Sequence, residues 1–344
     1  MNKKEYIDIS NTISLATDLF ENDLQIDSAL NLINKLCKEE LFNQLSNEFK
    51  YKIYILKARI LQSKTWFLEK KDREQITNYY FQASESTSEA SSEKHLSKAY
   101  GYFYAEDPRA AHQELNQILS QDPTNLNAIY LQVRYSETEE NLKSFLDSLD
   151  LTISRKPLFK ANLAIFYYNQ KNFNKGKSLL KEALDSFELK KIEELSYLNI
   201  FFNRYQLEAI DLMKQSKLSE NKIKELENLI PEIDSYWNKI KALEISKYFT
   251  SFLLSKLGYL SFQHKYEEIL KVCNEGLSKC EESSYEFSEF NFQKTIANCE
   301  LENYNEAYQS ILKVNLIQLP YAKPFLAEVE FKIDQFKEKK ENRE

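Results

Sequence analysis

The amino-acid sequence predicts an all-α fold, a right-handed superhelical solenoid of about eight antiparallel helical hairpins. Apolar residues recur with helical spacing along most of the chain, and only 4 glycines and 6 prolines occur in 344 residues. This composition leaves few residues for bulged strands or for glycine-rich loops that bind phosphate. In addition, small and large residues alternate at a repeating interval, which indicates helices that approach one another closely.

The stretch 157–188 shows this alternation best. Leu163, Ala164 and Tyr167 lie on one stripe of a first helix, and a polar break follows. The second helix carries its stripe at Phe173, Gly176, Leu180, Ala183 and Leu184. Because backbones can approach only where side chains are short, the small residues predict a tight antiparallel hairpin.

The spacing L-A-x-x-Y-x5-F-x-x-G-x3-L-x-x-A-L of this stretch resembles the tetratricopeptide repeat, a helix-turn-helix unit of about 34 residues. Lys160 and Glu188 stand where that repeat has Trp and Pro. Ala99, Val133 and Ala164 occupy equivalent positions in three successive units, at offsets of 34 and 31 residues. The resemblance implies an array of hairpins that binds a protein or peptide partner in a concave groove.

The whole chain, 1–344, is predicted to form one continuous array of this kind. Its parts are irregular hairpins over 1–83, a polar loop over 84–93, the best-defined repeats over 94–188, repeats with longer helices over 189–316, and a C-terminal cap with a charged tail over 317–344. Among the individual helices, we expect segments at 3–20, 26–41, 191–214, 219–230 and 233–263.

Charge and composition argue against several functional classes. The net charge is -7, and acidic and basic residues are interleaved, so we expect no binding to nucleic acid. No long apolar stretch or leader-like segment is apparent, so we expect a cytoplasmic protein that makes no membrane contact. The cysteines form no C-x-x-C pair and are expected to be reduced thiols: Cys37, Cys273, Cys280 and Cys299.

No pattern of residues predicts catalysis. The histidines His95, His112 and His264 lack a second His or Cys at metal-ligand spacing, and no pair of carboxylates stands out as acid and base. We therefore expect no catalytic residue, no metal and no cofactor. An enzyme is the rival class, which turnover abolished by a single substitution would reveal.

Aromatic residues indicate where a partner binds, since 22 Tyr and 22 Phe exceed the needs of the repeat core. The resemblance places first-helix side chains on the inner surface, and we expect the partner in a central groove over 96–204. The predicted contacts are Leu96, Tyr100, Tyr104, Tyr130, Arg134, Tyr168, Asn169, Asn199 and Asn203. The alternative is that some of these rings pack against the following repeat.

Two functions fit these features. The first is a non-enzymatic scaffold or adaptor that binds a protein or peptide segment in the groove. The second is an intracellular receptor for a short signalling peptide, similar to bacterial pheromone sensors but without a DNA-binding domain, because residues 1–45 read as a repeat hairpin. The Lys-x3-Asn and Lys-x3-Arg patterns that bind the acidic tails of chaperones are absent from the inner-surface positions.

Overall fold

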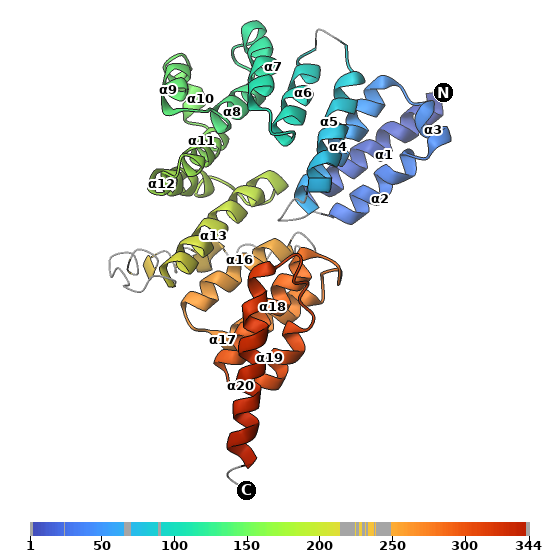
Figure 1. The fold of residues 1–344 in the computed structure, drawn as a ribbon. Coiled ribbons are helices and arrows are strands. Elements are labelled where there is room, and N and C mark those ends of the chain that lie inside the picture. Colours follow the sequence, from blue (N-terminus) through green and yellow to red (C-terminus); the bar gives the residue numbers. More distant parts are fainter. Residues whose placement is uncertain are drawn as a thin grey trace. The chain divides into compact units, whose positions relative to one another are not determined.

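The computed structural model describes residues 3–23, 25–64, 70–88, 91–213 and 249–341, together with scattered positions between 224 and 238. In these residues all regular secondary structure is helical, which confirms the predicted all-α class (Figure 1). The chain divides into two compact units, Met1–Phe201 (unit 1) and Phe202–Glu344 (unit 2). Within the described residues, no helix is long and apolar enough to cross a membrane.

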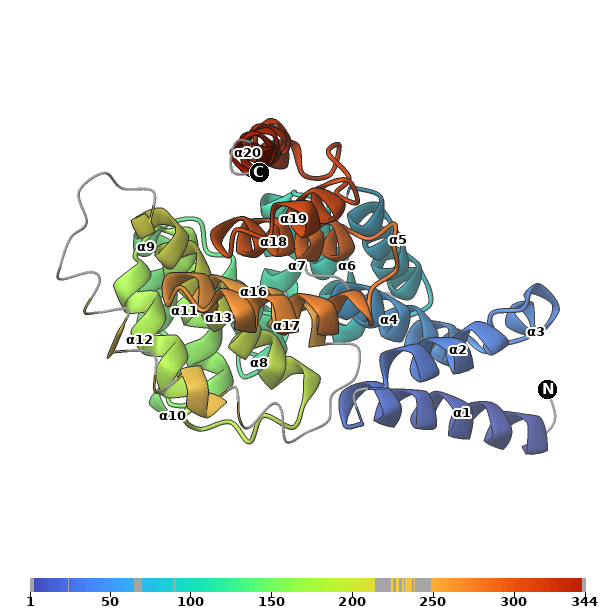
Figure 2. The same ribbon diagram turned by 90° about the horizontal axis from the view of Figure 1, so that it is seen from below.

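The first half of unit 1 consists of helices that pack against their neighbours in the chain. They are α1 (Lys3–Glu21), α2 (Ile26–Leu36), α3 (Glu39–Asn43), α4 (Asn47–Lys64), α5 (Lys70–Glu85), α6 (Ser92–Tyr104) and α7 (Pro108–Gln121). Helices α1 and α2 lie side by side, and α4, α5, α6 and α7 pack in succession (Figure 2). The helix predicted at 3–20 is confirmed. The one predicted at 26–41 is interrupted after Leu36, where the Cys37 N–H bonds back to Asn34 and Lys38 is extended.

The second half of unit 1 continues this pairing. Its helices are α8 (Leu126–Arg134), α9 (Glu139–Asp147), α10 (Leu151–Ser154), α11 (Pro157–Asn169), α12 (Phe173–Leu184) and the first part of α13 (Ile192–Met213). Helix α8 packs on α7 and α11, and α11 forms a hairpin with α12. Ala99, Val133 and Ala164 are fully buried, as equivalent repeat positions require.

Hairpin α11–α12 has the close approach that its small residues predict. A Cβ atom on Gly176 would lie 2.8 Å from the Tyr168 ring and 3.1 Å from the Ala164 carbonyl oxygen. Such distances are too short for a side chain, so glycine is what allows the two helices to meet here. Ala164 and Ala183 are both fully buried beside this contact.

One turn recurs between paired helices in both units. It follows α6, α11, α16 (Phe249–Phe262) and α18 (Tyr285–Glu300). Each turn contains one residue in the left-handed conformation, with φ between 54° and 61°: Glu106, Lys171, His264 and Glu302. The next residue then donates its N–H to the carbonyl five positions back, over 2.8–3.0 Å. This is the Schellman arrangement, which satisfies the free carbonyls of a helix end.

Because the residue after the left-handed position already begins the next helix, the connection is very short. Asp107 and Asn172 are those residues in unit 1, and each accepts a hydrogen bond from a backbone N–H three positions on. Their side chains thereby cap the second helix. The turn ends one helix and starts the next within two residues, so the helices must lie antiparallel and in contact.

Unit 2 is built from the same kind of pair. Its described helices are α16, α17 (Tyr266–Leu277), α18, α19 (Tyr304–Ile311), η1 (Pro320–Ala322) and α20 (Lys323–Glu341). Neighbouring helices pack from α16 to α20, and Figure 2 shows α16 to α19 beside one another. Gly276 admits the buried ring of Phe290, which lies 2.3 Å from where a Cβ would stand. The helices predicted at 219–230 and over the first part of 233–263 lie outside the described residues, apart from scattered positions.

The left-handed turn residues provide a test of this account. Replacing Lys171 by glycine removes the steric cost of φ 59°, and we expect it to raise the free energy of unfolding by about 0.5–1 kcal/mol. Ser178→Gly, at an exposed position inside α12, is the matched control and should lower it by about 0.5 kcal/mol. Urea unfolding measures both. A destabilised Lys171→Gly variant would contradict the left-handed turn.

Candidate functional site

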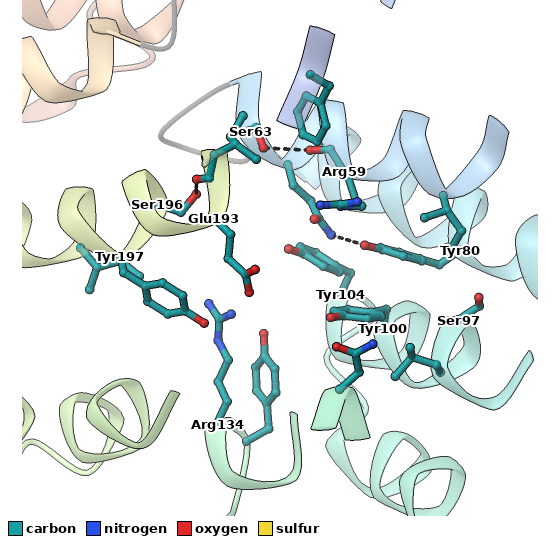
Figure 3. Close-up of a pocket in the computed structure, with 18 of the residues that line it drawn as sticks. Arg59, Ser63, Tyr80, Ser97, Tyr100, Tyr104, Arg134, Glu193, Ser196 and Tyr197 are labelled. Carbon is teal, nitrogen blue, oxygen red and sulfur yellow. Dashed lines mark hydrogen bonds between the residues drawn. The ribbon is translucent and has the colours of Figure 1, made fainter. Parts of the chain in front are cut away.

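Unit 1 contains a cavity of about 520 Å³. Its walls come from helices that are far apart in the chain: the end of α1, then α4, α5, α6, α8 and the first turns of α13. Figure 3 shows tyrosine rings on several sides, with charged side chains of α4, α8 and α13 directed towards the space between them. Aromatic walls with a few polar groups are the usual make-up of a ligand-binding cavity.

Four of the predicted contacts line this cavity: Leu96, Tyr100, Tyr104 and Arg134. The first three lie on one side of α6, and Arg134 is the last residue of α8. The spacing of four residues between Leu96, Tyr100 and Tyr104 places them on one helix face. These three predicted residues therefore lie on the face of α6 that lines the cavity.

Tyr130 and Tyr168, also predicted as contacts, are not among the residues that line this cavity. Tyr130 is 9% exposed and belongs to a core cluster with Phe159 and Phe166 of α11. Tyr168 is 3% exposed, and its ring covers Gly176 in the α11–α12 hairpin. Tyr130 thus packs against the following repeat, as the alternative expects, whereas Tyr168 packs within its own hairpin.

Two of the predicted asparagines are not among the residues that line the cavity. Asn169 is exposed at the end of α11, and Asn199 is half-buried on α13. Asn203 belongs to α13, but its side chain lies outside those that the structure describes, so its predicted contact stays a prediction.

Several cavity residues lie outside the predicted set. Arg59 comes from α4, Tyr80 from α5, and Glu193 and Tyr197 from α13. No repeat motif marks α13, so nothing in its sequence shows that its first turns meet the inner face of α6. The sequence carries a weaker signal for Tyr80, which lies at helical spacing from Ile76 and Ala83. Such spacing indicates a core position as readily as a ligand contact.

Stacked tyrosines form one wall. The ring of Tyr80 is stacked with Tyr100 at a centroid distance of 5.0 Å and with Tyr104 at 6.2 Å. Tyr80 is only 2% exposed, and the Gln62 amide donates a hydrogen bond to its hydroxyl over 2.8 Å. The stack is thus anchored at Tyr80 and presents Tyr100 and Tyr104 to the cavity.

The hydroxyls of this wall remain protonated. Burial raises the pKa of Tyr100 to about 12. Burial also raises the pKa of Tyr80, Tyr104 and Tyr197 above the ordinary value for a phenol. At neutral pH each therefore keeps its O–H, which can donate a hydrogen bond to an acceptor on a ligand.

Two arginines reach the cavity and differ in their partners. Arg59 forms an ion pair with Glu21, and its guanidinium carbon lies 5.5 Å from the ring centroid of Phe20. Arg134 lies 5.5 Å from the ring centroid of Tyr135, and its buried Nε has no hydrogen-bond partner. In the described part of the chain, Arg134 has no carboxylate within ion-pair distance.

Glu193 is the carboxylate that faces Arg134 in Figure 3. Glu193 is exposed to solvent as a residue. Loss of water around its carboxyl group nevertheless raises the pKa of Glu193, and the attraction of Arg59 and Arg134 offsets the effect only in part. Of the residues lining the cavity, Glu193 is the single carboxylate, and none is His or Cys.

The described residues contain no group of three or more His, Cys, Asp or Glu that could hold a metal ion. No model of a known protein family matches the chain, and a search of curated proteins finds no match either. The pairwise packing of neighbouring helices is compatible with a helical repeat.

The core position of Tyr130 predicts a contrast in stability. Tyr130→Ala should lower the free energy of unfolding by about 3 kcal/mol, because it leaves a cavity among buried side chains. Arg134→Gln should not lower it, since a half-buried cation without an ion-pair partner contributes little to folding. Thermal and urea unfolding of both variants test this contrast. Equal losses would show that the Arg134 side chain belongs to the folded core.

The raised pKa of Glu193 predicts a pH dependence. The folded state disfavours the charged form of Glu193, so ionised Glu193 lowers the free energy of unfolding at neutral pH. This loss of stability disappears as the pH falls through the raised pKa and the carboxylate becomes protonated. Glu193→Gln should therefore be more stable than the wild type at neutral pH and equally stable near about pH 4, below the unfolded pKa. Urea unfolding at the two pH values measures the difference. Glu137→Gln, at an exposed site outside the cavity, should show no such gain.

Proposed function

We propose that the protein is a non-enzymatic scaffold or adaptor that holds a protein or peptide segment in the cavity of unit 1. The observation that carries this proposal is the stacked tyrosine wall facing the guanidinium of Arg134 across an open volume of about 520 Å³. Tyrosine and arginine are the residues that contribute most to binding energy at protein interfaces. Phenol rings cover apolar side chains of a ligand, and their hydroxyls address its backbone.

The chemistry of the walls supports binding more than turnover. General acid-base catalysis uses two groups of matched pKa or a nucleophile beside a base. Glu193 has no second carboxylate or histidine beside it among the residues that line the cavity. The phenols keep their protons at neutral pH, so they act as hydrogen-bond donors rather than as bases.

The proposed architecture is a right-handed superhelical array similar to tetratricopeptide repeats. It is supported by the four turns that share one backbone hydrogen-bond pattern, by the succession of paired helices, and by the fully buried Ala99, Val133 and Ala164. An array of this kind presents one helix of each pair to its inner surface. In the proposed array, Tyr100 and Tyr104 of α6, which line the cavity, would be such inner-surface residues.

A receptor for a short signalling peptide is the second candidate, and the size of the cavity favours it. A volume of about 520 Å³ lies within the range of about 300–1,000 Å³ that encloses small ligands. A long segment of a folded partner would extend beyond such a space. The dependence of affinity on peptide length distinguishes the two candidates, because a receptor for short peptides gains nothing from added residues.

Filling the cavity tests the proposal. Wild-type protein is immobilised, exposed to a random peptide pool, and the retained peptides are sequenced and resynthesised. Asn127 is exposed and lines the cavity, so Asn127→Trp should occupy the space and raise the dissociation constant of these peptides at least about tenfold. Isothermal titration calorimetry measures the constants.

The control is Asn116→Trp, which adds the same side chain at an exposed position of α7 outside the cavity. It should bind the selected peptides as the wild type does. If no peptide is retained, or if Asn127→Trp binds the retained peptides unchanged, the cavity of unit 1 is not the binding site.

A further inference from the structure

Arg134 differs from Arg59 because its half-buried side chain has no ion-pair partner among the described residues. It ends α8, and its guanidinium points into the cavity from there (Figure 3). The Nε atom is shielded from solvent and lacks a hydrogen-bond partner. Arg59, in contrast, is already paired with Glu21. A partly buried cation without an ion-pair partner is suited to a ligand that brings a negative charge.

The groups around Arg134 are suited to an oxyanion. Tyr100, Tyr104 and Tyr197 line the same space and carry hydroxyls that can donate to an acceptor. The planar guanidinium offers parallel N–H groups that match the two oxygens of a carboxylate. These donors approach from α6, α8 and α13, so an anion bound here would be enclosed on several sides.

Glu193 limits the charge that the site accepts. Its carboxylate points towards Arg134 in Figure 3, beyond ion-pair distance, and any anion at Arg134 would share the space with it. A dianionic phosphate would meet stronger repulsion there than a carboxylate with a single charge. The site is therefore matched to one negative charge.

We propose that Arg134, with the hydroxyls of Tyr100, Tyr104 and Tyr197, forms a subsite for a carboxylate of the bound peptide. This inference rests on the proposed function, since it names the chemical group by which the peptide is held. The carboxylate comes from the peptide C-terminus or from an Asp or Glu side chain. Both sources present the same planar group to the guanidinium.

Three tetrapeptide pools with free N-termini test the subsite. The first has a free C-terminus and contains no Asp or Glu, the second is C-terminally amidated and contains Asp and Glu, and the third is amidated without them. Wild-type protein should retain the first or the second pool at least about tenfold better than the third, as expected for a buried arginine contact. Whichever pool is retained identifies the source of the carboxylate.

Variants assign this selectivity to Arg134. Arg134→Gln should retain the preferred pool no better than the third pool, while Arg134→Lys keeps part of the preference because it keeps the charge. Glu193→Gln should strengthen retention of the preferred pool, because it removes the competing negative charge. Urea unfolding confirms that each variant is folded, and Tyr104→Phe, which removes one hydroxyl, provides a milder second test of the same subsite.

The outcomes separate the two proposals. If the third pool is retained as well as the others, the protein binds peptides but the carboxylate subsite is wrong. Retention of the preferred pool by folded Arg134→Gln overturns the subsite in the same way. If the wild type retains none of the three pools although it retains peptides from the random pool, the subsite is wrong and the proposed peptide-binding function stands; if it retains peptides in neither experiment, both fail.

Discussion

Four of the helix pairs depend on a two-residue connection between their helices. One left-handed residue ends the first helix, and the next residue begins the second, as at Lys171 and Asn172. So short a link makes the second helix run antiparallel to the first. One side of each pair then remains unpacked. The next pair covers it, which is why neighbouring helices pack in succession through unit 1 and again through unit 2.

The cavity of unit 1 is formed by these successively packed helices together with α13, which is not one of the short paired helices. Paired helices α4–α5 and α6–α7 contribute the stacked rings of Tyr80, Tyr100 and Tyr104. Helix α13 contributes Glu193 and Tyr197 to the same cavity, although it is longer than the helices of the preceding pairs. Charges and phenols from separate parts of the chain thus meet in one space.

The sequence predicts the helices better than it predicts the site. Gly176 and Ala164 mark a hairpin because close packing needs small residues at particular positions, and that requirement is local. Tyr130 and Arg134 share a helix face by spacing, yet Tyr130 packs against α11 whereas the long side chain of Arg134 extends from the helix end into the cavity. Glu193 could not be predicted, because its position depends on where α13 returns to the array.

The recurring turn also determines how the chain can change without changing its course. Its hydrogen bonds run between backbone atoms, and the left-handed position is held by Glu, Lys or His in this protein rather than by glycine. Side-chain identity at such a position contributes little beyond a modest steric cost. Substitutions can therefore accumulate at these connections over evolutionary time while the path of the backbone persists. Chains with very different sequences can then share the same architecture.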